Sequence, residues 1–320
     1  MIKKAIIVTG GAGFIGSNLV KSLLSDSRVS KVLVIDDLSN GSLENLIEVK
    51  EHPKFEFIRA DICDYNKMVQ LFSGYDLISH QAALGSVPRS IKDPMTVGTV
   101  NIMGTVNVMH AATVNKIDKV VLACSSSTYG DSKALPKQED IIGKPLSPYA
   151  ITKYTNELYA EVFNKIYGLN FIGLRYFNVF GPNQSPDNPY AAVIPLFCKA
   201  FLNGQSPTVY GDGKTSRDFT YVENAVQANI LALFSEAEGD NEIYNVACGE
   251  KITLNDIVKN LNVISNKEIK PRYSDFREGD VRHSLADIDK IKNKLGYEPK
   301  VNFKDGLSKV YNWYKAKHNG

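Results

Sequence analysis

The chain has 320 residues, of which 43% are hydrophobic and 22% are charged, and its formal net charge is +2. These values indicate a globular protein with a large core, either one big domain or two unequal ones. Because the charge is spread out with no long basic run, we expect neither nucleic acid nor a membrane as a partner. No apolar stretch is long enough to span a bilayer, and no signal peptide precedes the first strand, so the sequence predicts a cytoplasmic protein.

The beginning of the chain predicts a strand, a glycine turn, a helix and a second strand that ends in a carboxylate, Asp36. In the turn, Gly10 permits a tight bend, Gly13 lets backbone amides approach a pyrophosphate, and Gly16 lets the helix pack close to its strand. Asp36 is placed to accept hydrogen bonds from both hydroxyls of an adenosine ribose, and its charge repels a 2′-phosphate. This order of elements predicts a dinucleotide site that prefers NAD to NADP.

Short apolar runs alternate with helical patterns as far as residue 247. We expect strands over residues 5–9, 31–35, 55–60, 77–80, 119–125, 171–177 and 243–246. We expect helices over residues 18–25, 66–72, 96–114, 149–167 and 223–235. Since most of the strands are apolar on both faces, the sequence predicts a doubly wound parallel, Rossmann-type α/β fold.

The pattern changes after Asn178, where a turn-rich segment is followed by a helical stretch over 191–203. Beyond Thr253 the chain is mostly helical, with a weak strand near 270–273. We therefore expect a smaller, discontinuous α/β domain that forms the far wall of a cleft. The expected division gives residues 1–177 and 217–248 to the NAD-binding domain, and residues 178–216 and 249–320 to a substrate domain.

A candidate alcohol-oxidation site combines a tyrosine, a lysine and a serine. Tyr149 and Lys153 are four residues apart on one predicted helix, so they share a face. A nearby ammonium and an oxidised nicotinamide ring both favour the phenolate that could act as a base. Ser125, at the end of a strand, is suited to hydrogen-bond a substrate hydroxyl. Each feature alone has a plainer interpretation, a turn or a solvated surface pair, but together they complete a site.

The chain resembles extended short-chain dehydrogenases/reductases, specifically the sugar-nucleotide 4-epimerases, over essentially its whole length. The matching motifs are Gly10-x-x-Gly13-x-x-Gly16, Asp36, Asp61-Ile62, Gln81-Ala82-Ala83, Asn101-x-x-Gly104-Thr105, Ser125, Tyr149-x-x-x-Lys153, Arg175–Gly181, Arg217-Asp218-Phe219 and Arg277–Asp280. This resemblance implies an enzyme that holds NAD and acts on a uridine diphosphate sugar, with Ser125, Tyr149 and Lys153 as catalytic residues.

The resemblance also implies the residues around each ligand. Those expected around NAD are Gly10, Gly13, Phe14, Ile15, Gly16, Asp36, Asn40, Gly41, Asp61, Ile62, Gln81, Ala82, Ala83, Asn101, Tyr149, Lys153, Tyr176 and Asn178. Those expected around the UDP-sugar are Gly85, Ser86, Ser125, Ser126, Ser127, Asn178, Gln184, Ala192, Val193, Tyr210, Arg217, Arg277, Asp280 and Ser284. The guanidinium groups of Arg217 and Arg277 are suited to forked bonds with a diphosphate.

The residues after Ser125 bear on the reaction. Dehydratases and decarboxylases of this family carry acids in this segment, whereas this chain has Ser126 and Ser127. The simplest cycle is therefore oxidation at C4, rotation of the keto-sugar and return of the same hydride, which leaves NAD unchanged and able to stay bound. A dehydratase, a decarboxylase, another oxidoreductase and a non-catalytic dinucleotide sensor are the alternatives.

The expected sugar pocket has small side chains at Gly85, Ser86, Ala192 and Ser284, with Asn178 and Gln184 as polar partners. A roomy wall admits a 2-acetamido group, although Gly85 and Ser284 could be small for loop geometry alone. We expect UDP-N-acetylglucosamine and UDP-N-acetylgalactosamine as the substrate pair. Plain UDP-glucose and UDP-galactose, and the uronic acid form, remain alternatives. The resemblance suggests a role in making precursors of surface polysaccharides.

Helices 96–114 and 149–167 carry apolar residues on more than one face, among them Val100, Met103 and Leu158. Packing against the same helices of a second subunit would bury them, and the resemblance implies a homodimer formed through such a four-helix bundle. The cysteines and histidines lack the spacing of a metal site, so no metal is expected.

Overall fold

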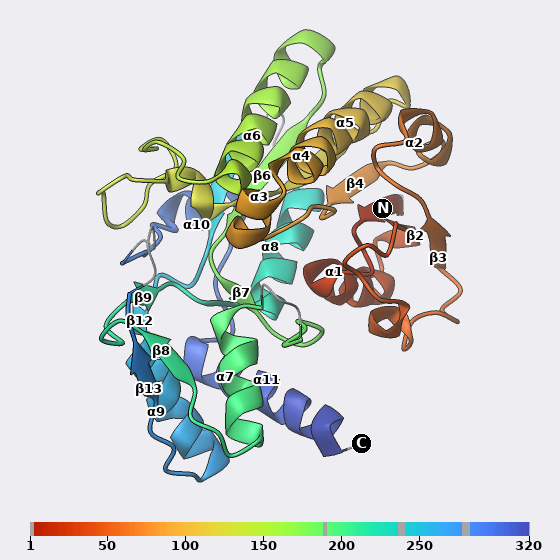
Figure 1. The fold of residues 1–320 in the computed structure, drawn as a ribbon. Coiled ribbons are helices and arrows are strands. Elements are labelled where there is room, and N and C mark those ends of the chain that lie inside the picture. The colour runs from red at the N-terminus through yellow and green to blue at the C-terminus, as the bar shows by residue number, and fades with distance from the viewer. Residues whose placement is uncertain (1–2, 188–190, 236–240, 277–281, 320) are drawn as a thin grey trace.

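The computed structural model describes residues 3–187, 191–235, 241–276 and 282–319 (Figure 1). Its centre is a seven-stranded sheet in the order β11-β6-β5-β4-β1-β2-β3, and all of its pairings are parallel. The strands of this sheet are β1 (Lys4–Thr9), β2 (Val29–Asp36), β3 (Phe55–Arg59), β4 (Leu77–His80), β5 (Lys119–Ser125), β6 (Phe171–Tyr176) and β11 (Glu242–Val246). Each expected strand of the parallel sheet is therefore present.

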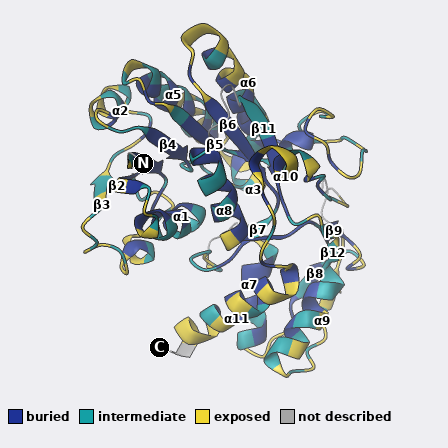
Figure 2. Cartoon of the chain, turned by 180° about the vertical axis from the view of Figure 1, so that it is seen from behind, coloured by how far each residue is buried: buried dark blue, intermediate teal, exposed yellow. Residues whose placement is uncertain are grey.

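Helices cover both faces of this sheet because its strands are apolar on both sides. Ile6 and Val8 of β1 belong to a core that includes residues of α1 (Phe14–Ser25) and α8 (Val222–Leu233). Ile7, between them, belongs to the opposite core, with residues of α2 (Tyr65–Leu71), α5 (Gly104–Val114) and α6 (Pro148–Tyr167). In Figure 2 the central strands β4, β5 and β6 are mostly dark blue, whereas helices such as α6 and α11 carry yellow. The fold is thus doubly wound and Rossmann-type, as predicted.

The strand order reverses between β1 and β4, which are neighbours in the sheet although β2 and β3 come between them in sequence. Successive strands step away from this point in opposite directions. In sheets of this kind the ligand crevice lies beyond the carboxyl ends of the strands at the reversal. The turns after β1 and β4 are therefore the first places to look for a site.

A second group of elements lies beyond those carboxyl ends, in the lower part of Figure 1. Three helices pack against one another there: α7 (Val193–Leu202), α9 (Leu254–Ser265) and α11 (Phe303–Asn319). Beside them, β8 (Thr208–Tyr210) pairs in parallel with β13 (Arg272–Ser274). The short β12 (Ile252–Thr253) pairs antiparallel with β9 (Ser216–Arg217). The remaining elements are η1 (Leu43–Leu46), α3 (Val87–Lys92), η3 (Ser126–Tyr129), β7 (Val179–Phe180), β10 (Thr220–Tyr221) and α10 (Asp289–Leu295).

The helix expected over 96–114 is interrupted. It consists of α4 (Pro94–Gly98), a π-helical turn η2 (Thr99–Met103) and then α5. Asn101 within the π turn is fully buried. Single π turns inside α-helices often occur beside functional sites.

A buried carboxylate ties together the stretches of chain that connect the two groups. Asp218 accepts hydrogen bonds from the backbone N–H groups of Cys248, Gly249 and Ala286, at 3.0, 3.0 and 3.2 Å. Burial raises its pKa to about 6, and the backbone donors oppose that shift. The carboxylate thus fixes β9, the loop after β11 and the segment before α10 relative to one another.

Candidate active site

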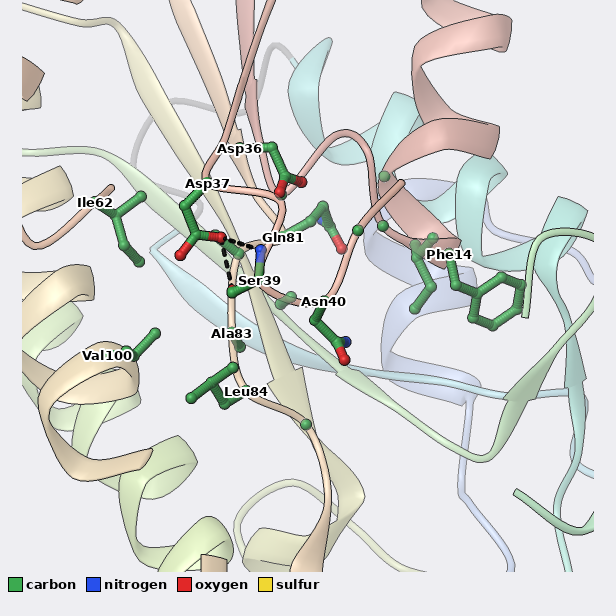
Figure 3. A pocket seen from close by; sticks show the side chains of 18 of the residues that line it. Phe14, Asp36, Asp37, Ser39, Asn40, Ile62, Gln81, Ala83, Leu84 and Val100 are labelled. Atoms are coloured by element: carbon green, nitrogen blue, oxygen red, sulfur yellow. Dashed lines mark hydrogen bonds between the residues drawn. The ribbon is translucent and has the colours of Figure 1, made fainter. Parts of the chain in front are cut away.

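A cavity runs along the carboxyl ends of β1, β2, β4 and β5. Figure 3 shows Ile62 and Val100 on one side of it, Phe14 on the opposite side, and Asp36 and Ser39 between them. Its two sides therefore differ in chemistry: an apolar slot lies next to carboxylate and hydroxyl groups. The apolar side suits a flat aromatic base, and the polar side suits the hydroxyls of a ribose joined to it.

The glycine turn between β1 and α1 leaves no room for side chains. Gly10 has φ +69°, and a Cβ atom there would lie 2.5 Å from the amide nitrogen of Ala82. A Cβ atom at Gly16 would lie 2.2 Å from the carbonyl oxygen of Gly10, so Gly16 allows close approach to the turn itself. Gly13 precedes α1 without any side-chain cap, and the first-turn amides of α1 therefore face the cavity as an anion site.

Asp36, at the end of β2, is held in place by backbone donors. Its Oδ2 accepts from the Ala12 amide at 3.0 Å, and its Oδ1 accepts from the Leu38 amide at 2.9 Å. Burial raises the pKa of this carboxyl, and the two backbone hydrogen bonds oppose the shift. Each carboxylate oxygen keeps a free lone pair, because ionised carboxylates have about four acceptor positions. A ribose diol fits that acceptor pair.

Ser125, Tyr149 and Lys153 come together from β5 and α6. Tyr149 and Lys153 line the cavity, and Ser125 is the hydrogen-bond partner of the Tyr149 phenol. The Ser125 oxygen accepts two hydrogen bonds from Ser127, from its hydroxyl at 2.9 Å and its amide at 3.2 Å. The hydroxyl hydrogen of Ser125 is therefore left for the phenol.

Burial acts strongly on both ionisable groups. It raises the pKa of Tyr149, and the Ser125 hydrogen bond partly offsets this. It lowers the pKa of Lys153, whose Nζ donates to the Ala123 carbonyl at 2.8 Å. His80, one strand away, is not available for catalysis: its two ring nitrogens contact Thr9 and Thr105 hydroxyls, and burial lowers its pKa to about 3.

All of the residues expected around NAD line this cavity except two. Asn101 turns away: its Oδ1 accepts from the Leu84 amide at 2.8 Å, and its Nδ2 donates to the Thr152 hydroxyl at 3.1 Å. Asn178, with φ +36°, lies in the neighbouring cavity and donates to the Asp218 carbonyl at 3.0 Å.

A second cavity, of about 690 Å³, lies between the carboxyl ends of the sheet and the second group of elements. Tyr149 and Gly85 line both cavities. Of the residues expected around the substrate, Gly85, Ser86, Asn178, Ala192, Val193, Tyr210 and Arg217 line it. The described part of its lining contains no Asp or Glu.

The other expected substrate residues lie differently. Gln184 lines an adjoining cavity instead. The backbone of Ser284 is bonded to Ser216, next to Arg217, and Ser125, Ser126 and Ser127 follow β5 beside Tyr149. Arg277 and Asp280 fall outside the described residues.

Sequence reasoning missed Arg282 and Phe276, which both line the second cavity. The Arg282 guanidinium lies 4.7 Å from the centre of the Phe276 ring. The Phe276 ring packs against Gly211, which has φ +77°; a Cβ atom on Gly211 would lie 2.2 Å from the ring. The only sequence signal for them is their position, since Phe276 and Arg282 flank the Arg277–Asp280 motif.

Residues 6–247 match the NAD dependent epimerase/dehydratase family. The chain belongs to this family. A putative UDP-glucose 4-epimerase of Methanocaldococcus jannaschii is 37% identical over 97% of this chain and 98% of its own length. The UDP-N-acetylglucosamine 4-epimerase of Methanobrevibacter ruminantium M1, solved with UDP-N-acetylmuramic acid, is 40% identical and superposes with a TM-score of 0.94 over 99% of this chain and 100% of that one.

The UDP-glucuronic acid 4-epimerase of Bacillus cereus, solved with UDP-glucuronic acid and NAD, is 33% identical. Its TM-score is 0.91, over 98% of this chain and 99% of that one. The protein is accordingly an NAD-dependent enzyme of the epimerase type, and NAD is the cofactor predicted from the glycine turn and Asp36. Within the described residues no helix is long and apolar enough to cross a membrane. That same part of the chain holds no cluster of metal-ligating side chains.

Proposed function

We propose that the enzyme interconverts UDP-N-acetylglucosamine and UDP-N-acetylgalactosamine by epimerisation at C4, with NAD kept bound. The observation that carries this proposal is the shared boundary at Tyr149: one phenol borders both the cavity that fits NAD and the cavity beside it. A sugar held in the second cavity would lie against this phenol and next to the cavity that fits NAD. We assign residues 1–177 and 217–248 to NAD binding, and residues 178–216 and 249–320 to substrate binding.

In this mechanism Tyr149 takes the proton of the sugar C4 hydroxyl and later returns it to the epimer. Ser125 hydrogen-bonds the phenol, which lowers the pKa of Tyr149, and it guides the C4 oxygen. Lys153, in its ammonium form, favours the phenolate. The chemistry that bound NAD would supply is a reversible acceptor for the C4 hydride. The Gly10–Gly16 turn, the first amides of α1 and the Asp36 carboxylate fit its pyrophosphate and ribose.

The chemistry of the second cavity supports a nucleoside diphosphate group there. Arg217 and Arg282 supply two guanidinium groups, and Val193 begins α7, whose N-terminal amides favour an anion. Arginine forks match phosphate oxygens in geometry. Arg277 and Asp280 remain proposed contacts from the sequence.

The lining of this cavity argues against elimination of water and loss of carbon dioxide. Those reactions need a side chain that delivers or removes a proton at a second carbon atom. Ser126 and Ser127 follow Ser125, and the described lining has no carboxylate. Epimerisation at C4 needs only one hydride and one proton, which both leave the C4 carbinol group and both return after the keto-sugar has turned over.

The small residues that line the second cavity support a substrate with a 2-acetamido group. A Cβ atom at Gly85 would have nothing within 4 Å, and its backbone does not need glycine, so this residue keeps space open. Ala192, which lines the same cavity, adds only a methyl group. The similarity to an archaeal UDP-N-acetylglucosamine 4-epimerase favours the same conclusion. Pocket size discriminates by only a few kcal/mol, about 1–3 for one methylene, so the substrates must be compared directly.

We also propose that two copies associate through α4, η2, α5 and α6 into a four-helix bundle. On α6 the side chains of Ile151, Leu158, Val162 and Ile166 recur at helical spacing and are 51%, 45%, 46% and 66% exposed. Met95 and Met103 expose similar surface on the neighbouring elements. Contiguous apolar surface of this kind marks protein interfaces.

The test is to give purified enzyme UDP-N-acetylgalactosamine without added cofactor and to follow the C4 epimer by NMR. UDP-galactose and UDP-glucuronic acid, at equal concentration, measure the sugar preference. We expect conversion of the acetylated sugar with the highest kcat/KM, and no free NADH. A 4-keto-6-deoxy product or released carbon dioxide would replace the proposal with dehydration or decarboxylation. Absence of conversion with every sugar would refute it.

A further inference from the structure

Ser90, on α3, bonds the backbone of the proposed catalytic tyrosine. Its side chain is fully buried, and its Oγ accepts a hydrogen bond from the Tyr149 amide at 3.0 Å. The same hydroxyl donates to the Val87 carbonyl at 2.8 Å. The Tyr149 amide belongs to the first turn of α6 and has no acceptor within that helix. A residue 59 positions away in the sequence therefore supplies the cap.

The segment that Ser90 bonds is the wall between the two cavities. Leu84 and Gly85 line the NAD cavity, and Gly85, Ser86 and Val87 line the substrate cavity. Ser86 has φ +147°, which is strained for a residue with a side chain, and its Oγ accepts from the Arg89 amide at 3.2 Å. Strained backbone persists where surrounding bonds hold it, often at functional sites.

A second connection reaches Tyr149 from the same wall. The Asn101 side chain accepts from the Leu84 amide and donates to the Thr152 hydroxyl. The Thr152 hydroxyl in turn donates to the Tyr149 carbonyl at 2.8 Å. The Tyr149 amide is thus bonded directly to Ser90, and the Tyr149 carbonyl is connected to Leu84 through the side chains of Thr152 and Asn101. Asn101, Thr152 and Ser90 are all at most 3% exposed.

We infer that Ser90 and Thr152 are positioning residues, which fix the phenol of Tyr149 relative to the wall that faces the sugar. This inference deepens the proposed function and rests on it for its kinetic consequence. The two hydroxyls do not touch substrate or cofactor. They set the distance between the base and the C4 oxygen, and misplacement of a catalytic group by 1 Å costs about 100-fold in rate.

The chain offers a matched control at the same helix end. Ser147 caps α6 by accepting from the Ala150 amide at 3.1 Å, but it makes no bond to residues 84–90 that the structure describes. Ser90→Ala and Ser147→Ala each remove one hydroxyl and leave one first-turn amide of α6 without its side-chain acceptor. Only Ser90→Ala also cuts the connection to the wall.

We expect Ser90→Ala to lower kcat about tenfold, with KM and NAD content within twofold of wild type, and Ser147→Ala to lower kcat less than twofold. Thr152→Val, which keeps the side-chain shape but removes the hydroxyl, should lower kcat by a similar factor. Thr152→Ser, which keeps the hydroxyl, should have a kcat close to that of wild type. Equal kcat values for Ser90→Ala and Ser147→Ala would overturn the inference, because a helix cap alone would then explain Ser90. A wild-type enzyme inactive on every UDP-sugar would instead refute the proposed function.

Amide hydrogen exchange tests the connection without any substrate. Peptides covering 84–92 and 148–152 should both exchange faster in Ser90→Ala than in wild type, whereas Ser147→Ala should affect only the second. Unchanged exchange over 84–92 in Ser90→Ala would overturn the inference whatever the activity. Faster exchange there with a kcat equal to that of wild type would overturn it as well, because the connection would then not position the base.

Discussion

At the scale of single residues, burial acts in opposite directions on the pKa values of Tyr149 and Lys153. It raises the pKa of the phenol and lowers that of the ammonium, so both side chains are pushed towards their neutral forms. A phenol in that state is a poor base. The positive nicotinamide ring of oxidised NAD would lower the pKa of the phenol, so the fraction of phenolate would be greatest when the hydride acceptor is bound.

Tyr149→Phe removes only the phenolic oxygen of this site. We expect kcat to fall about 1,000-fold, within the range typical of a lost general acid–base, while NAD content stays the same. Product formation and the nucleotide released on denaturation measure the two quantities. Turnover near the wild-type rate would exclude the phenol as the base.

Ser125→Ala should move the pH dependence of the reaction. The Ser125 hydrogen bond lowers the pKa of Tyr149, so its loss raises that pKa further. The fraction of phenolate at a given pH falls, and the low-pH limb of the kcat profile should shift to higher pH. Rates between pH 5 and 10 test this, with Ser25→Ala, on the exposed end of α1, as the control. Superimposable limbs would contradict the assigned role.

At the scale of elements, the turn between β1 and α1 depends on close backbone contact. In Gly16→Ala the new methyl group meets the Gly10 carbonyl, so we expect the free energy of unfolding to drop by about 2 kcal/mol and NAD content to drop with it. Urea titration followed by Trp313 fluorescence measures the first quantity.

Gly98→Ala is the control for that substitution. Gly98 ends α4 with helical dihedral angles, and a Cβ atom there would have nothing within 4 Å. Alanine in a helix is favoured over glycine by about 0.5–1 kcal/mol, so stability should stay the same or rise. Equal losses in the two variants would show that the turn has no special need for Gly16.

The elements of the sheet were predictable from the sequence, while the π turn was not. Strands such as β4 and β5 have predicted bounds that agree with the structure, because apolar runs bounded by turn residues suffice to mark buried parallel strands. The interruption at η2 coincides with bonds from Asn101 to Leu84 and Thr152, which are distant in sequence. The pairing of β8 with β13 depends in the same way on long-range contact.

The same limit applies to the site. The glycine turn, Asp36, Tyr149 and Lys153 have local signatures whose chemistry can be read from spacing, and they line one cavity. Ser90 has no such signature, because its role depends on which helix end it meets in space. Arg282 and Phe276 were missed for a similar reason, since neither lies in a strand or helix with a recognisable pattern.

At the scale of the whole molecule, the exposed face of α6 predicts the oligomeric state. Ile166→Asp places a charge in the proposed bundle. We expect wild type to be a dimer and this variant a monomer, as measured by light scattering after gel filtration. Val263→Asp, on α9, introduces the same charge at a side chain that is 68% exposed and outside the bundle, and it should leave the dimer intact. A monomeric wild-type protein would refute the bundle.

The bonds of Asp218 bear on how loops from a relative could be grafted into this enzyme. Its carboxylate bonds the amides of Cys248, Gly249 and Ala286, and these stretches lead to Arg217 and Ser284. A designer who wishes to transplant sugar preference from a relative can replace the loops around these positions as cassettes. We expect such grafted loops to keep their position relative to the sheet only if Asp218 and the three backbone amides that it bonds are kept unchanged.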